Sequence, residues 1–307
     1  MFTKNTSLVI PTHNRSKNIE ATLKNLQELK LRFFEIIIVD SSNKKEKKLL
    51  KSICEKYDVK LINSYPSTSH QRNLGLKSKD KNTKFIMFLD DDLIFFQNSF
   101  QEMDKFINNK KIKRIIAYSF NHYLKTKNNL IEKIKISKIS NLLSLYSKKP
   151  GIVMNSGWHT KIINLKRNTF VQWLPTAAVI FHSSLIKNKT FDESFGRYSY
   201  LEDLDFSLSV KKDNYKFVVV SKAKFFHPNH ISRINFKFGY LEIINRFKIV
   251  SKYNLNELYF LYMGVIKSLF SLLYVFSGNI NYIFKFLGNC FGLVRCLCAI
   301  IKNNFLK

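Results

Sequence analysis

The fold is decided by a short stretch that reads Phe85-Ile86-Met87-Phe88-Leu89-Asp90-Asp91-Asp92. Five apolar residues in a row, stopped by polar ones, are typical of a buried β-strand. Two earlier stretches have the same form, since an apolar run at 7–10 precedes Pro11, Thr12, His13, Asn14 and Arg15, and another at 34–39 precedes Asp40 to Asn43. The sequence therefore predicts three strands that each end in a polar or acidic cluster.

Amphipathic stretches separate these strands. Apolar residues recur at helical spacing after each of the first two clusters, and residues 71–76 indicate a third helix, which follows a further short strand at 59–62. Strands that alternate with helices form right-handed crossovers in a parallel sheet. Ligands of such sheets lie outside the carboxyl ends of the strands. We therefore predict an α/β protein whose ligand site is built from the three clusters.

The acidic triplet itself points to a cation. Neighbouring carboxylates repel one another by about 1 kcal/mol or more per pair at an intermediate dielectric, and a hard divalent ion removes this repulsion. An extended chain would direct Asp90 and Asp92 to one side and Asp91 to the other. The alternative is a solvated loop or the cap of a helix over 93–96. No dinucleotide-binding glycine turn and no P-loop occurs in the sequence.

The composition limits the function classes. The chain has 307 residues with 51 Lys+Arg against 22 Asp+Glu, a net charge of +29, and it is 45% hydrophobic. The many large apolar residues argue against disorder. The basic excess is spread evenly, so a nucleic-acid-binding tail is not favoured. Four cysteines without paired spacing favour a reducing compartment, and the N-terminus shows no secretory signal.

At this point the motifs resemble those of family 2 glycosyltransferases with the GT-A fold. The first two strand ends, Gln71-Arg72-Asn73-Leu74-Gly75 and the acidic triplet match in order and spacing. In the second half, 191–195 followed by Tyr200-Leu201-Glu202-Asp203-Leu204-Asp205-Phe206 is similar to the acceptor-side signature, and His227 stands where a late histidine is common. The resemblance covers about residues 5–230. It implies a nucleotide-sugar-binding half at 1–120, an acceptor half at 121–232 and a C-terminal region at 233–307.

The resemblance also implies roles for single residues in an inverting, metal-dependent transfer from a nucleotide-diphosphate sugar. Asp203 would be the general base, because inversion needs a carboxylate that removes the proton of the acceptor hydroxyl. Asp92 and His227 would hold Mn²⁺ or Mg²⁺, and Glu202 and Trp173 would lie on the acceptor side. The donor nucleotide would contact Pro11, Thr12, His13, Asn14, Arg15, Asp40, Arg72, Asn73, Asp90 and Asp91.

Simpler interpretations exist for some of these residues. His227 could be a satisfied histidine at a strand end, and the acids at 202, 203 and 205 could serve only the N-terminus of a helix. His13 replaces a common tyrosine of the family. The Gln-x-x-Arg-Trp motif of processive members is absent, which favours addition of a single sugar. The insert at 121–170 has no clear counterpart and is expected to shape the acceptor side.

The C-terminal quarter is apolar and basic. Residues 258–277 are interrupted only by Lys267, and 280–301 by Lys285 and Arg295. A lysine at the centre of a spanning helix costs about 2.5–3.5 kcal/mol, so amphipathic helices that lie in the interface, with their basic groups at the headgroups, are favoured. A membrane span or hairpin and a soluble helical cap are the alternatives. We expect a peripheral or monotopic enzyme on the cytoplasmic face of a bacterial membrane, with an anionic surface and a glycan or lipid-linked acceptor as partners.

Three other functions compete with this one. A nucleic-acid-binding protein would fit the charge, but the aromatic residues lie in hydrophobic runs and the strand ends are acidic. A nucleotidyltransferase would share the sheet and the metal site but would release pyrophosphate. An inactive homologue that serves as a membrane scaffold is disfavoured by the intact acids at 90, 92 and 203.

Overall fold

The computed structural model describes residues 1–109, 113–124, 147, 149–211, 214–227 and 233–305. The chain divides into two compact units. Unit 1 comprises Met1–Lys125 and Ile162–Asn229, and unit 2 comprises Thr126–Lys161 and His230–Lys307. Much of the predicted insert at 121–170 lies outside the described residues.

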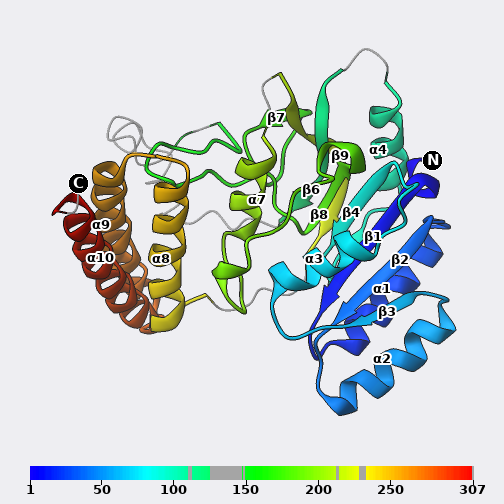
Figure 1. Cartoon of the computed structure of the whole chain (residues 1–307), viewed down its shortest axis with the longest axis horizontal. Helices are drawn as coiled ribbons and strands as arrows, with labels where there is room; N and C mark the ends of the chain where they lie inside the picture. The colour runs from blue at the N-terminus through cyan, green and yellow to red at the C-terminus, as the bar shows by residue number, and fades with distance from the viewer. Residues whose placement is uncertain (110–112, 125–146, 148, 212–213, 228–232, 306–307) are drawn as a thin grey trace. The chain divides into compact units, whose positions relative to one another are not determined.

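The first half of unit 1 alternates strands and helices (Figure 1). A 3-10 turn, η1 (Phe2–Asn5), precedes β1 (Thr6–Thr12), α1 (Ser16–Glu28), β2 (Glu35–Asp40), α2 (Lys44–Lys56), β3 (Lys60–Asn63), α3 (Thr68–Ser78) and β4 (Phe85–Leu89). These strands pair in parallel in the order β3-β2-β1-β4. The predicted α/β pattern and the parallel sheet are confirmed here.

The second half of unit 1 extends the same sheet with mixed strand directions. It contains β5 (Ile94–Phe95), α4 (Ser99–Ile107), β6 (Ile115–Tyr123), β7 (Thr169–Val171), β8 (Ala178–His182), α7 (Glu202–Val210) and β9 (Lys216–Phe226), with short 3-10 turns η2 (Ser183–Leu185) and η3 (Glu193–Phe195). β8 is antiparallel to both β4 and β6, whereas β6 and β9 run parallel. The described part of the sheet continues β4-β8-β6-β9-β5, and β7 pairs with β9.

The segment after the acidic triplet does not form the helix that one interpretation of the sequence placed at 93–96. Residues 93–96 do not start a helix, because Ile94–Phe95 forms the short strand β5 against β9. Asp91 and Asp92 lie in a turn between β4 and β5. The side-chain alternation expected of an extended chain therefore does not apply to them.

The parallel strands are the centre of the core of unit 1. All residues of β1 and β4 are buried, as expected for strands that are covered on both faces. Helix α3 packs on β1 and β2 (Figure 1). This approach is close, because a Cβ atom on Gly75 would overlap a side-chain methyl of Val9.

Unit 2 contains three long helices, α8 (Phe236–Lys252), α9 (Glu257–Leu273) and α10 (Asn281–Phe305), with the 3-10 turn η4 (Val275–Ser277) between the last two. Gly288 and Gly292, one turn apart on α10, face α8 so closely that a side chain at either would meet Phe236, Tyr240 or Ile243. Among the described residues, one stretch, Asn281–Lys302 of α10, is long and apolar enough to cross a membrane. Length and composition alone do not separate such a helix from a packed core helix.

The contact between Gly75 and Val9 gives a test of the fold. Alanine usually stabilises a helix interior by about 1 kcal/mol relative to glycine, but at position 75 we expect Gly75→Ala to lower the free energy of unfolding by about 1–3 kcal/mol through overpacking. The double variant Gly75→Ala/Val9→Ala should be more stable than the sum of the two single losses predicts. Urea unfolding of the four proteins measures this coupling, and strictly additive losses would contradict the packing.

Candidate active site

The end of β1 is joined by an ion pair and hydrogen bonds to the acidic turn, by which we mean Asp90–Asp92 after β4. Thr12 Oγ1 donates to Asp91 Oδ2 at 2.7 Å. Arg15, the residue before α1, places Nη1 3.0 Å from Asp91 Oδ1 and 3.3 Å from Asp92 Oδ2. Thr22 of α1 donates to the backbone carbonyl of Asp91 at 3.0 Å. Asp91 therefore holds the first loop to the acidic turn.

The loops after β1 and β2 are held together by small polar groups. His13 Nδ1 lies 2.9 Å from the carbonyl oxygen of Ser41. The backbone N–H of Asn14 donates to Ser42 Oγ at 2.7 Å, and the Asn14 side-chain carbonyl accepts from the backbone N–H of Asn43 at 2.9 Å. Pro11 pairs with Val39 in the sheet register. The predicted nucleotide loop, 11–15, is thus fixed against the end of β2.

Asp40, the last residue of β2, is fully buried. Its Oδ1 accepts hydrogen bonds from the backbone N–H and the hydroxyl of Ser42. Its Oδ2 is buried and has no hydrogen-bond partner within the part of the chain that the structure describes. Buried polar atoms usually have a hydrogen-bond partner, so this oxygen makes Asp40 a candidate ligand-binding group.

Arg72 of α3 joins the acidic turn to the start of α7. Its guanidinium is 3% exposed, places Nη2 3.0 Å from Asp90 Oδ1, and forms a short ion pair through Nη1 with Glu202 Oε1. Burial by itself lowers the pKa of Arg72, but the charges of Glu202 and Asp90 raise it. Arg72 therefore remains a cation that neutralises acids from two separate motifs.

Burial changes the pKa of two carboxyl groups at the site. It raises the pKa of Glu202 to about 7, against the opposing charge of Arg72. It also raises the pKa of Asp91 to about 6, against the hydrogen bond from Thr12 and the charge of Arg15. Both acids lie where removal from water outweighs the nearby cation.

Asp203 is the second residue of α7, next to Glu202. Its Oδ1 accepts from the backbone N–H of Leu204 at 2.8 Å, and its side chain is half-buried. The charge of Asp203 acts on both Arg72 and Glu202. The structure thus places Asp203, the expected general base, close to Arg72 and Glu202.

Asp92 and His227 form the pair that the sequence assigns to a metal. His227 Nε2 lies 2.7 Å from Asp92 Oδ1. Burial opposes protonation, but the hydrogen bond and charge of Asp92 raise the pKa of His227. No group of three or more His, Cys, Asp or Glu that could hold a metal occurs among the residues that the structure covers. One carboxylate and one imidazole nevertheless suit Mn²⁺ or Mg²⁺ when substrate phosphate and water supply the other ligands.

Two predicted site residues have partners elsewhere in unit 1. The side-chain amide of Asn73 donates to the carbonyl oxygen of Phe191 and to Glu193 Oε1, both at 2.9 Å, and its carbonyl accepts from the N–H of Phe191 at 2.7 Å. Trp173 is buried in the loop between β7 and β8, where its neighbour Leu174 is hydrogen-bonded to Ser207 of α7.

Some residues of the site were not predicted. Gln71 is buried and donates through Nε2 to the carbonyl oxygens of Thr12 and Val39, at 2.8 and 2.7 Å, so that it ties the ends of β1 and β2 to α3. Gln71 stands in the quoted Gln-Arg-Asn motif, which was a usable signal. Ser42 lies in the predicted Asp40–Asn43 cluster, whereas Thr22 carries no pattern that would have distinguished it from an ordinary helix residue.

The fold and the acids gathered at its strand ends define a glycosyltransferase of the GT-A type. The sequence profile described as glycosyl transferase family 2 matches residues 7–193, and the chain belongs to that family. This confirms the enzyme class and the fold predicted from the motifs. No curated protein sequence matches the chain significantly.

Solved structures share the fold at low sequence identity. The TarS fragment 1–349 of S. aureus is 15% identical with a TM-score of 0.51, over 84% of this chain and 68% of that one. GalNAc-T7, solved with UDP, GalNAc and Mn²⁺, is 14% identical with a TM-score of 0.53, over 72% and 43%. The mannosyltransferase PcManGT of Pyrobaculum calidifontis, in complex with GDP-Man and Mn²⁺, is 13% identical with a TM-score of 0.54, over 99% and 88%.

The buried ion pairs of Arg72 give a pH-dependent prediction. Arg72→Leu should lower the free energy of unfolding by about 3 kcal/mol or more near neutral pH, because it leaves Glu202 and Asp90 without their cation. The pKa of Glu202 in the folded protein lies above its unfolded value of about 4.3, so its protonation favours the fold at low pH, and this contribution is lost as the pH rises through about 7. Without Arg72 that pKa rises further.

The loss in free energy of unfolding caused by Arg72→Leu should therefore become smaller towards acidic pH. Urea unfolding of both proteins at about pH 6 and about pH 8 measures the difference. Arg32→Leu, which removes an exposed arginine of the same unit, is the control. Equal deficits of Arg72→Leu at the two pH values would contradict this account of Glu202.

Proposed function

We propose that the protein is a metal-dependent, inverting glycosyltransferase that moves one sugar from a nucleoside-diphosphate donor to an acceptor hydroxyl. The observation that supports it best is the position of Arg72, which pairs with Asp90 of the acidic turn and with Glu202 beside Asp203. Groups from the donor motifs and the acceptor motif therefore meet around one buried cation. This is the arrangement that transfer between two bound substrates requires.

The donor nucleotide occupies the edge formed by the ends of β1 and β2. The base is bound by Asp40, whose buried Oδ2 lacks a partner among the described residues and can accept an N–H of the base. The 11–15 loop encloses the nucleotide, Asp90 faces the ribose, and Arg72 supports Asp90. Asp91 acts indirectly, because its side chain holds Thr12 and Arg15.

The leaving diphosphate is neutralised at the acidic turn. Asp92 and His227 would hold Mn²⁺ or Mg²⁺ there, and the bound ion would stabilise the negative charge that develops on the departing nucleoside diphosphate. In this structure Arg15 Nη1 lies 3.3 Å from Asp92 Oδ2, and His227 Nε2 lies 2.7 Å from Asp92 Oδ1.

Asp203 removes the proton of the acceptor hydroxyl. The hydroxyl oxygen attacks the anomeric carbon, the bond from that carbon to the diphosphate oxygen breaks, and the proton remains on the Asp203 carboxyl group. Asp203 stands in the first turn of α7. Glu202 and Trp173 lie on the acceptor side of this reaction.

The test of this function uses the full chain with a panel of nucleotide sugars and Mn²⁺, and identifies the released product. We expect a nucleoside diphosphate, and pyrophosphate would instead show a nucleotidyltransferase. Asp203→Asn should lower sugar transfer by about 10²–10⁴-fold without changing nucleoside-diphosphate affinity, whereas Asp58→Asn, an exposed acid of the same unit, should leave both unchanged. Near wild-type transfer by Asp203→Asn would remove this residue from the mechanism.

We also propose that this activity is located at the cytoplasmic face of a bacterial membrane and acts on a glycan or lipid-linked acceptor. The exposed surface of unit 2 supports the membrane part of this proposal. Large apolar side chains of α9 and α10 are exposed at helical spacing. They are Leu258, Tyr262, Val265, Leu269 and Leu273 on α9, and Phe284, Leu287, Phe291, Val294, Leu297 and Ile301 on α10. Groups of exposed large apolar side chains on neighbouring helices mark interaction sites.

Two basic groups of unit 2 that the sequence places in its apolar stretches or beside them are paired inside the unit. Lys285 forms an ion pair of 2.9 Å with Glu242 of α8, and Arg246 is buried with its guanidinium 4.6 Å from the Trp158 ring. The sequence analysis expected the basic groups of this region to reach lipid headgroups. Lys285 does not do so, because it pairs with Glu242. Helices that expose Phe, Leu and Val beside a few basic groups, here Arg295 and Lys302 of α10, are suited to a membrane surface.

Vesicle flotation with anionic lipid tests this location. Phe284→Glu/Phe291→Glu removes two apolar anchors that are 52% and 58% exposed, and we expect it to weaken vesicle binding by about 100-fold. Phe34→Glu, at a phenylalanine of unit 1 that is 51% exposed, should bind like the wild type. Unchanged binding by the double variant would show that these helices do not contact lipid.

A further inference from the structure

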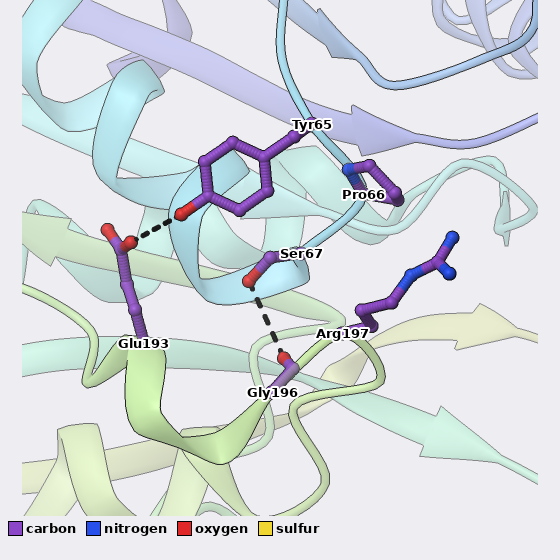
Figure 2. Close-up of a pocket in the computed structure, with 6 residues that line it drawn as sticks. All are labelled: Tyr65, Pro66, Ser67, Glu193, Gly196 and Arg197. Carbon is purple, nitrogen blue, oxygen red and sulfur yellow. Dashed lines mark hydrogen bonds between the residues drawn. The ribbon is translucent and has the colours of Figure 1, made fainter.

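A pocket of about 420 Å³ opens in unit 1 beside the start of α3 (Figure 2). Residues 65–67, which follow β3, form one wall, and residues of the 193–197 segment, which precedes α7, form the other. Its lining residues are Tyr65, Pro66, Ser67, Glu193, Gly196 and Arg197. Small-molecule sites commonly measure about 300–1,000 Å³, so the pocket has room for a small ligand.

Tyr65 gives this pocket a fixed aromatic surface. Its ring stacks on the ring of His70 with 4.0 Å between centroids, and its hydroxyl donates to Glu193 Oε2 at 2.8 Å (Figure 2). The side chain is nevertheless 54% exposed. An exposed aromatic ring that is held on one face and at its hydroxyl loses little further freedom when a ligand packs on it.

The polar groups of the pocket are of two complementary kinds. Glu193 is an acceptor, already oriented by Tyr65, by His70 Nδ1 at 3.0 Å and by Asn73 Nδ2 at 2.9 Å. Arg197 is exposed, and its guanidinium makes no hydrogen bond or ion pair with any residue that the structure describes. In the view of Figure 2 the two side chains lie on opposite sides of Ser67.

We propose that this pocket binds one pyranose unit of the acceptor glycan. The C–H face of a pyranose packs on an aromatic ring, whose face is apolar and weakly negative. Its hydroxyl groups both donate and accept, so they can donate to Glu193 and accept from Arg197. This assignment rests on the proposed function, because it takes the acceptor to be a saccharide.

The chain connects the pocket to the proposed base. Ser199 Oγ donates to the carbonyl of Gly196 at 2.7 Å and accepts from the N–H of Ser69 in α3 at 3.3 Å. Ser199 and Leu201 then turn the chain through left-handed backbone angles, φ 47° and φ 73°, into α7. Arg197 thus precedes Asp203 on a short, tightly turned segment that is anchored to the same helix as Arg72.

The experiment measures binding of methyl pyranosides to the full chain by saturation-transfer NMR, with a nucleoside diphosphate and Mn²⁺ present at saturation. We expect at least one pyranoside to bind. Tyr65→Ala and Arg197→Ala should each weaken that binding by about tenfold, and Tyr65→Phe, which keeps the ring, should weaken it less. Tyr215→Ala and Arg32→Ala, at exposed residues of the same unit outside the pocket, are the matched controls and should bind like the wild type.

Nucleoside-diphosphate affinity, measured by calorimetry on the same variants, shows whether the pocket is a pyranose site or a part of the nucleotide site. It should be unchanged in all of them. If Tyr65→Ala weakens nucleotide binding and leaves pyranoside binding intact, the pocket belongs to the nucleotide site and the proposal fails. It also fails if no pyranoside binds, or if the controls lose as much as the pocket variants. Failure of the wild type to bind any nucleoside diphosphate would instead refute the proposed function.

Discussion

The site of this glycosyltransferase depends on one buried guanidinium. Arg72 contacts Asp90, 18 residues away in the sequence, and Glu202, 130 residues away. A buried carboxylate needs a counter-charge, and Arg72 supplies one to the buried Glu202 and at the same time pairs with the partly exposed Asp90. The position of α7, and with it Asp203, is therefore linked electrostatically to the acidic turn that follows β4.

The parallel half of the sheet determines what Arg72 can reach. β1, β2 and β4 end at the same edge, so Thr12, Asp40 and Asp90 lie there together. Gln71 ties the ends of β1 and β2 to α3, and Gly75, one turn further on, allows that helix to pack closely on Val9. The Gln-Arg-Asn-Leu-Gly motif thus combines a packing requirement with a charge requirement.

The parallel half and its strand-end clusters could be predicted because their signals are local, as at 85–92, where an apolar run meets three acids. The antiparallel strand β8 also has a local apolar run, at 177–181. That run does not show that the strand pairs with both β4 and β6, because these partners lie far away in the sequence. Side-chain partners were also beyond prediction. The sequence motifs cannot show that Asn73 binds the 191–193 segment. They also cannot show that Asp91 is hydrogen-bonded to Thr12 and ion-paired with Arg15. The roles assigned to the site residues stay predictions.

The net charge of +29 has different uses in the two units. In unit 1, Arg15 and Arg72 neutralise acids that would otherwise repel a diphosphate. In unit 2, Lys285 pairs with Glu242 between α10 and α8, and Arg246 is buried against Trp158. The exposed surface of α10 carries large apolar side chains beside Arg295 and Lys302. Leaving one Leu or Phe in water forgoes about 1.5–3 kcal/mol, so the exposed apolar residues of α9 and α10 outweigh any surface ion pair. The proposed adhesion of this unit to a membrane is therefore expected to rest on apolar contact first and on charge second.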